Sequence, residues 1–384
     1  MVASIWLAVA PPAAAAVTAQ TYPSYAPTDP KSVVAQVARR DPRELAMRAA
    51  LREDPERVDL ATELARADIQ RARALQDPRY LGRAQATLAR WWAQDDPPPD
   101  VLLLRATIRQ SLHDFTGARA DLDRLIGERP DDAQAQLTLA VVATVTADYP
   151  TARQGCARVA ELAAPLVATT CIAQIDGVTG HAEPARQALA AELARGGVDP
   201  ALRGWAETAL AELSIVRGDY AAAAAQLHEV LALDPDDAYG RAALADVLMW
   251  TGHPADASAL LAGREMIDNL LVRRAIAEHA AHGPAAQKLA QAMRDRIAAA
   301  AERGDRVHLR EHAMFELEVE GDARRALALA LDDWAVQKEL ADARIVAAAA
   351  WAAGDPASAE PVRAWARANG VEDVQLAQLL GGAP

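Results

Sequence analysis

Aromatic residues are scarce in this 384-residue sequence: Phe, Trp and Tyr together make up 4%, although apolar residues reach 52%. Runs of β-branched residues bounded by turn residues, which mark strands, are also scarce. Much of the apolar content is alanine, the strongest helix former. A mean hydropathy of −0.06 excludes a bundle of membrane helices. The composition therefore predicts an all-α protein, and the length allows either several domains or one extended array.

Clusters of Lys and Arg are missing as well. The formal charge is −13, and basic residues nowhere form a stripe with aromatics between them. Nucleic acid is therefore not expected as a partner. The acidic surface would attract basic partners weakly. No nucleophile elbow, phosphate-binding loop or dinucleotide fingerprint occurs, so we expect no cofactor.

The N-terminus is predicted to be a secretory signal over residues 1–19. An apolar stretch is followed by small residues at Val17 and Ala19, as signal peptidase requires. No basic residue precedes this stretch, so a tail on a cytoplasmic protein is the alternative to periplasmic export. Residues 20–30, rich in Pro and Tyr, are expected to form an extended tether, and 31–384 the folded array. The apolar stretch is too short to span a bilayer.

A short sequence motif recurs along the chain. It consists of Gly followed by Asp or His, an alanine five residues after the Gly and, in the best copies, an apolar residue four further on. The copies begin at Gly180, Gly218, Gly252, Gly321 and Gly354, with looser copies at His113 and Ala147. Successive copies lie 34, 33, 38, 34, 69 and 33 residues apart, which indicates one period with one copy missed. Glycine can take the left-handed conformation that ends a helix, and the short polar residue favours the start of the next.

This pattern resembles the tetratricopeptide repeat family, whose period is 34 residues. The best copy, GWAETALAELSIVRGDYAAAAAQLHEVLALDP from Gly204, matches the family pattern at Leu210, Ala211, Gly218, Tyr220, Ala223, Leu227 and Pro235. The resemblance implies a right-handed solenoid of about 8–10 helix pairs with a concave binding surface. The clearest repeats are expected at 100–263 and 307–370, and a degenerate stretch at 265–303. With its exported start, the chain looks like the uncharacterised repeat proteins of Gram-negative bacteria, which implies no specific activity.

The resemblance also implies which residues line the concave groove, because the first helix of each pair faces inward. The expected groove residues are aromatic, acidic or apolar: Trp205, Glu212, Tyr239, Asp246, Met249, Trp250, Glu311, Phe315 and Trp351. Such a groove suits an apolar or basic protein segment. The alternative is that several of these aromatics only pack between helices.

One stretch carries possible chemistry. His308-Leu-Arg-Glu-His312 matches the inverted zinc-peptidase pattern, in which two histidines four residues apart bind zinc. The stretch lies in the first helix of a well-matched repeat, however, and the chain ends near where the third ligand would be needed. A solvated or groove-lining role is therefore the main interpretation, and a zinc hydrolase the alternative.

The only two cysteines, Cys156 and Cys171, fall on helices expected to be adjacent. A disulfide between them is plausible in an oxidising periplasm, and two buried thiols are the alternative. Taken together, the sequence predicts a non-catalytic, periplasmic protein-binding or scaffold module.

Overall fold

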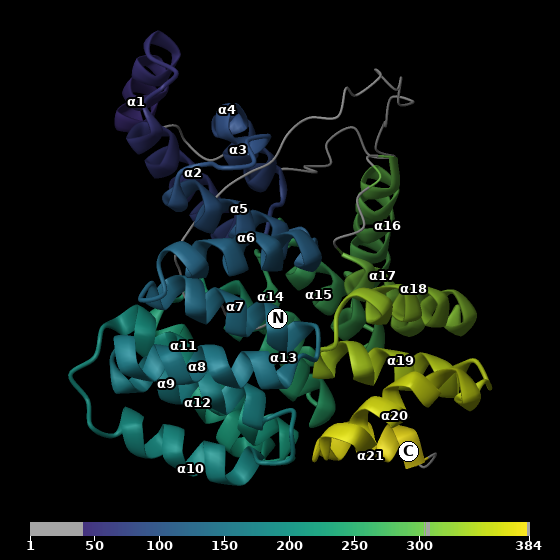
Figure 1. Cartoon of the computed structure of the whole chain (residues 1–384). Helices are drawn as coiled ribbons and strands as arrows, with labels where there is room; N and C mark the ends of the chain where they lie inside the picture. Colours follow the sequence, from purple (N-terminus) through teal and green to yellow (C-terminus); the bar gives the residue numbers. More distant parts are fainter. Residues whose placement is uncertain (1–40, 303, 305–307, 382–384) are drawn as a thin grey trace.

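The computed structural model describes residues 41–302, 304 and 308–381, so the expected signal peptide and tether lie outside the described residues. Within the described part, all regular structure is helical, and consecutive helices pack as antiparallel pairs (Figure 1). The predicted all-α repeat fold is therefore confirmed. None of these helices is long and apolar enough to cross a membrane.

The N-terminal half runs through ten helices. They are α1 (Pro42–Glu53), α2 (Val58–Leu75), α3 (Arg79–Thr87), α4 (Ala89–Trp92), α5 (Pro99–Ser111), α6 (Phe115–Glu128), α7 (Ala133–Val145), α8 (Tyr149–Leu162), α9 (Pro165–Asp176) and α10 (Ala182–Leu193).

The C-terminal half continues the same arrangement. Its elements are α11 (Pro200–Val216), α12 (Tyr220–Leu233), α13 (Ala238–Trp250), α14 (Pro254–Leu261), α15 (Asp268–Ala280), α16 (Ala286–Glu302), α17 (Leu309–Phe315), a π-helical turn η1 (Glu316–Glu320), α18 (Ala323–Val336), α19 (Leu340–Ala352), a 3-10 turn η2 (Pro356–Ala359), α20 (Glu360–Asn369) and α21 (Val374–Gly381). The stretch expected to be degenerate, 265–303, contains the helix pair α15 and α16.

The recurring motif forms the turn between the two helices of each pair. Left-handed backbone occurs at each of its seven positions, at φ between 61° and 81°: His113, Ala147, Gly180, Gly218, Gly252, Gly321 and Gly354. In several copies the following Asp caps the second helix, as where the Asp219 carboxylate accepts from the Ala222 amide at 3.1 Å. In the copy that the spacing had missed, His282 takes this conformation (φ 51°) and Gly283 does not. The turn geometry therefore recurs even where glycine is replaced.

The alanine of the motif lies where the two helices of a pair meet. It is at most 5% exposed in all seven copies: Ala118, Ala152, Ala185, Ala223, Ala257, Ala326 and Ala359. A larger side chain there would force the helices apart, because protein interiors are packed without spare volume. This is why a sequence with few aromatics can still build a continuous core.

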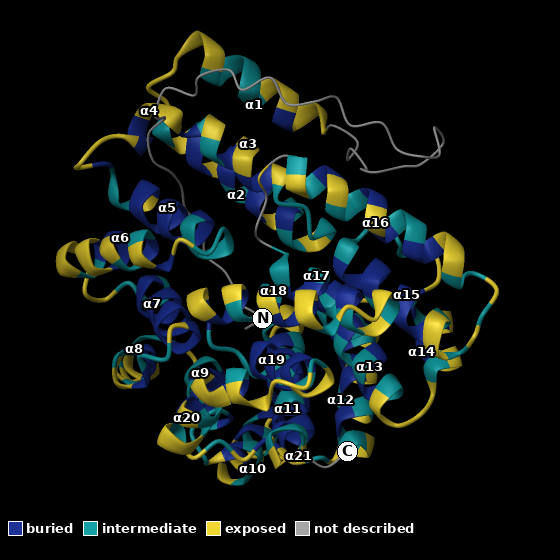
Figure 2. Cartoon of the chain, turned by 90° about the vertical axis from the view of Figure 1, so that its right-hand side faces the viewer, coloured by how far each residue is buried: buried dark blue, intermediate teal, exposed yellow. Residues whose placement is uncertain are grey.

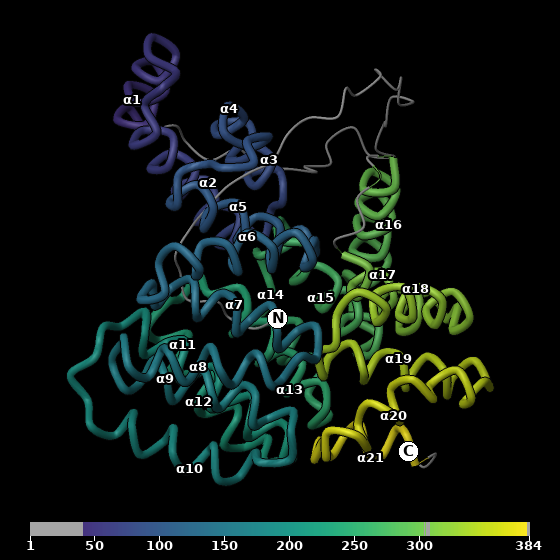
Figure 3. Tube along the Cα trace, in the orientation of Figure 1, coloured from purple at the N-terminus to yellow at the C-terminus, as the bar shows by residue number. Residues whose placement is uncertain are grey.

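The array closes on itself, which the repeat pattern did not predict. The path of the chain returns so that α19–α21 lie beside the turns of α7–α13 (Figures 1 and 3). The Lys338 amide, just before α19, donates to the Val145 carbonyl at the end of α7 at 2.7 Å. Gly180 and Gly370 approach so closely that a Cβ on Gly180 would lie 2.6 Å from the Gly370 carbonyl oxygen.

Some helices of the array are buried on nearly every side. Residues Ala135–Val145 of α7 are all buried, as are most residues of α11 and α19 (Figure 2). In an open solenoid, one face of each of these first helices would line a solvent-filled groove. Here the segment before α19 reaches α7 through Lys338, Leu340 packs against the core of α9–α11, and a central cavity remains.

Candidate functional site

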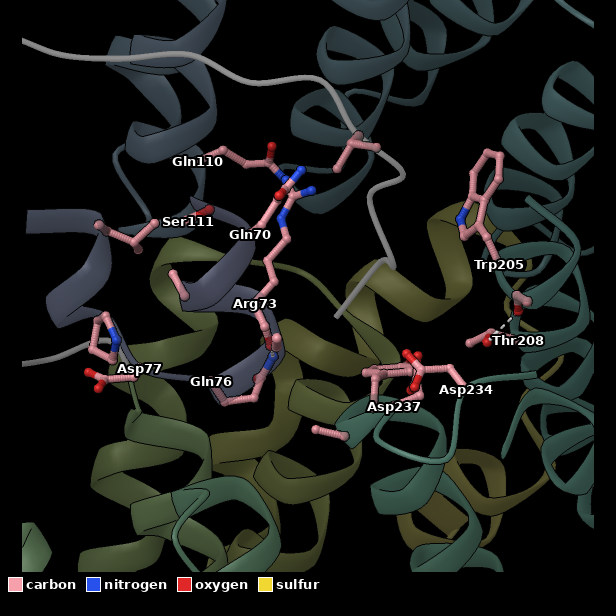
Figure 4. Close-up of a pocket in the computed structure, with 18 of the residues that line it drawn as sticks. Gln70, Arg73, Gln76, Asp77, Gln110, Ser111, Trp205, Thr208, Asp234 and Asp237 are labelled. Atoms are coloured by element: carbon pink, nitrogen blue, oxygen red, sulfur yellow. Dashed lines mark hydrogen bonds between the residues drawn. The ribbon is translucent and has the colours of Figure 1, made fainter. Parts of the chain in front are cut away.

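The central cavity has a volume of about 740 Å³. Its walls come from distant parts of the chain: α2 and α5 on one side, α7, α11 and the α12–α13 turn on another, and the segments around α17 and before α19 on a third. Figure 4 shows Arg73 and Gln110 on one wall, Trp205 and Thr208 on the opposite wall, and Asp234 and Asp237 below. This size falls within the range of about 300–1,000 Å³ that is typical of ligand sites.

Trp205 is placed in the cavity wall by the start of α11. The Asp199 carboxylate caps this helix through the Ala201 amide at 2.9 Å, and Pro200 occupies its first position. The Trp205 side chain is 3% exposed, yet its indole Nε1 has no hydrogen-bond partner among the residues that the structure describes. In Figure 4 the indole faces the opposite wall. A buried donor without a partner is costly, and at a cavity wall it marks a place where a ligand acceptor would fit.

Glu311, on the first turn of α17, is the buried carboxylate of the cavity. It is 4% exposed, and the nearest basic group in a described pair is His308, whose Nδ1 lies 3.8 Å from Oε2. Burial alone would raise the pKa of Glu311, but the hydrogen bond from His308 and the charges of Arg310 and Arg273 outweigh it and lower the pKa to about 2. Glu311 is therefore charged at neutral pH.

The two guanidinium groups near Glu311 are paired with other carboxylates. Arg310 donates to Asp342 and, at 2.5 Å, to Glu339. Arg273 donates to both oxygens of Asp246, at 2.9 and 2.8 Å. Two guanidinium groups thus lie among four carboxylates when Glu311 is included, and His308 lies beside Glu311.

Tyr239 also lines the cavity, at the start of α13. Its hydroxyl donates to the Glu212 carboxylate on α11. Burial raises the pKa of both groups, and the proximity of Glu212 raises that of Tyr239 further. Three of the expected groove residues, Trp205, Tyr239 and Glu311, are therefore brought together at one cavity.

The other expected groove residues lie elsewhere. Phe315 is 1% exposed and packs in the core between α15 and α16, and Met249 packs beside that core. Trp250 is partly exposed, between the Tyr220 ring at 5.9 Å and the Arg344 guanidinium at 5.3 Å. Trp351 on α19 is 48% exposed.

Several cavity residues had no signal in the repeat pattern. Arg73 and Gln110 come from N-terminal helices that match the pattern weakly or not at the groove positions, and Glu339 precedes α19. Their position at the cavity depends on how the helix pairs are arranged around it, which involves residues far apart in sequence. The motif did predict a turn at His113, and this residue forms both the turn before α6 and part of the cavity wall.

The two histidines of the His308–His312 stretch have different neighbours. His308 lies beside Glu311 at the cavity, whereas His312 Nε2 lies 2.9 Å from Glu316 Oε1. Burial lowers the pKa of His312. Among the residues that the structure describes, no group of three or more His, Cys, Asp or Glu side chains is arranged to hold a metal ion.

Cys156 on α8 and Cys171 on α9 are joined by a disulfide, with their Cα atoms 5.7 Å apart. Both are buried, at 3% and 4% exposure. The bond links two successive repeats through the middle of α8 and of α9. It is consistent with an oxidising compartment.

Comparison with known proteins gives the class of the repeat. Residues 216–269, which include α12 and α13, match the tetratricopeptide repeat family. No curated protein matches the sequence. Among solved structures, a tetratricopeptide repeat protein from Parabacteroides merdae is similar, with 14% identity and a TM-score of 0.31 over 80% of this chain and 90% of that one. The TPR domain of P58(IPK) is similar with 14% identity and a TM-score of 0.22, over 81% and 92%. The described part of the chain is thus an all-α array of helix pairs, of which residues 216–269 match the tetratricopeptide repeat.

Proposed function

We propose that this chain is an exported, non-catalytic binding module that holds a segment of a partner protein in its central cavity. The observation that carries the proposal is the cavity itself, with the unpartnered Trp205 indole and the charged Glu311 in its wall. The match to a family of repeats that generally serve as protein-interaction modules supports it. Aromatic and acidic walls suit a partner segment that is apolar or basic.

Export rests on the apolar N-terminal stretch and on the disulfide, since disulfides persist in oxidising compartments. The chain would then work in the periplasm, after cleavage behind Ala19. N-terminal sequencing of the protein from the periplasmic fraction tests this. A mature chain that begins at Gln20 supports export, and an intact chain found only in the cytoplasm contradicts it.

Site-specific photocrosslinking tests the cavity. A photoreactive amino acid at Ser111, a partly buried residue of the cavity wall, is compared with one at Arg195, whose side chain is 71% exposed in the loop after α10. We expect a defined adduct from Ser111 that Trp205→Ala weakens, and none from Arg195.

Two results would contradict the proposal. Equal adducts from both positions would indicate non-specific contact with the acidic surface. No adduct from Ser111 together with an adduct from Trp351 would place the partner on the outer aromatic residues instead of in the cavity.

A further inference from the structure

The chemistry of the cavity wall can be taken one step further, to the kind of segment it accepts. This step rests on the proposed function. Two features point to a ligand: the buried carboxylate of Glu311, whose described ion pair is with His308 alone, and the Trp205 indole N–H, which has no acceptor among the described residues. Glu311 requires a cationic group on the ligand, and Trp205 requires a hydrogen-bond acceptor.

The first feature is Glu311. It is buried and ionised, and in the described part of the chain it forms no ion pair with a lysine or arginine. The nearby Arg310 and Arg273 are held by Asp342, Glu339 and Asp246. A histidine is charged only when it is protonated, so an arginine or lysine that enters from the cavity would give Glu311 a permanently charged partner.

The second feature is Trp205. Its Nε1–H is a donor only, so it can be satisfied by a carbonyl or carboxylate oxygen but not by a cation. The acidic groups around the cavity, which include Asp77, Asp234, Asp236 and Asp237, disfavour an anionic ligand. A backbone carbonyl is the neutral acceptor that every residue of a protein segment offers.

We infer that the cavity binds an extended basic segment of a partner protein, with an arginine or lysine side chain paired to Glu311 and a backbone carbonyl accepting from Trp205 Nε1. An extended segment presents free carbonyls, whereas a helix uses its own carbonyls internally. The carboxylates that line the cavity, such as Asp234 and Asp237, suit the charge of such a segment.

The test uses the full chain and fluorescently labelled peptides. One peptide is Ala-Arg-Ala-Arg-Ala-Gly, and its matched control replaces each arginine with citrulline, which has nearly the same shape and no charge. Fluorescence anisotropy measures binding to the wild type, to Glu311→Gln and to Trp205→Phe. The matched control variant is Glu360→Gln, which also removes one carboxylate but does so on the exposed start of α20.

We expect the arginine peptide to bind the wild type at least about tenfold more tightly than the citrulline peptide. Glu311→Gln should weaken binding by about tenfold or more, because a desolvated charge pair is lost, and Glu360→Gln by less than about twofold. Trp205→Phe keeps an aromatic ring and removes the donor, so a loss of about three- to tenfold is expected. Circular dichroism checks that each variant is folded, and if Glu311→Gln is not, the Trp205→Phe and citrulline comparisons decide.

Equal binding of both peptides, or equal effects of Glu311→Gln and Glu360→Gln, would overturn the inference, since either result assigns binding to overall charge. Failure of the arginine peptide to bind, with the Ser111 adduct retained and weakened by Trp205→Ala, would overturn the inference alone and leave the proposed function intact. Loss of both would overturn both.

Discussion

The indole Nε1 of Trp365 on α20 donates a hydrogen bond of 3.0 Å to the hydroxyl of Tyr149 on α8, although 216 residues separate them. Tyr149 is buried in the core of the middle repeats, and Trp365 in the core of the C-terminal ones. A helical array whose repeats contacted only their neighbours would keep these residues apart. The bond is therefore a direct mark of closure.

Removing the Tyr149 hydroxyl should weaken this closure. Tyr149→Phe leaves the buried Trp365 N–H without an acceptor, which costs about 1–3 kcal/mol of unfolding free energy. Urea denaturation measures the change. The control is Tyr220→Phe, because the Tyr220 hydroxyl has no hydrogen-bond partner among the described residues, and a change within about 0.5 kcal/mol is expected there. Equal losses in both variants would contradict a specific role for the bond.

Two glycines separate the effect of backbone conformation from that of closure. Gly180 and Gly252 both have positive φ, 74° and 81°, but a Cβ on Gly180 would meet the Gly370 carbonyl oxygen, whereas one on Gly252 would meet nothing within 4 Å. Either change to alanine should cost about 1–2 kcal/mol from the left-handed conformation. Gly180→Ala should cost clearly more, because backbone atoms must move. Thermal unfolding of both variants measures this, and similar melting temperatures would indicate that the C-terminal repeats do not press on Gly180.

The disulfide should contribute to stability through the unfolded state. It closes a sequence separation of 15 residues, for which the chain-entropy model gives about 3 kcal/mol. Replacing both Cys156 and Cys171 with alanine should lower the unfolding free energy by about that amount, and reductant should then have no further effect. Mass spectrometry of alkylated, unreduced protein provides the check on the bond itself. Two alkylated thiols in protein from the periplasm would contradict it.

Stability should fall as pH rises through the neutral range because of Asp333. Burial, and then the neighbouring Asp342, raise the pKa of Asp333 to about 8, well above its value in an unfolded chain. Between about pH 4 and 8 the folded protein therefore holds a proton that the unfolded chain releases, so folding is less favourable at higher pH. Asp333→Asn, which imitates the protonated acid, should flatten this dependence and stabilise the protein most at pH 8.

Urea titrations at pH 5, 6.5 and 8 compare this variant with the wild type. The adjacent, exposed Asp332 supplies the matched variant, Asp332→Asn, which should retain the wild-type slope. If Asp333→Asn also retained that slope, Asp333 would not be the group that titrates.

Much of the fold could be predicted from the sequence, because a helix pair is specified locally. The period, the left-handed turn at positions such as Gly218, and the buried alanine such as Ala223 all depend on residues within one repeat. Closure could not be predicted in this way. Tyr149 and Trp365 are ordinary aromatics in their own repeats, and nothing in the 34-residue pattern states that they meet.

The same distinction explains the candidate site. Trp205, Tyr239 and Glu311 were expected to face inward, and all three line the cavity. The inward register alone could not reveal that Phe315 would be covered by α15 and α16, or that Arg73 and Gln110 would supply the opposite wall. Those placements depend on how far the array turns, which is set by the packing of many repeats together.

The measurement that tests the account most directly is small-angle X-ray scattering of the full chain. A closed array should give a radius of gyration within several Å of the roughly 21 Å expected for a compact chain of this length, and a distance distribution with a single maximum. An open array of the same helix pairs would give a markedly larger radius and an elongated distribution. That result would contradict closure and, with it, the cavity on which the proposed binding depends.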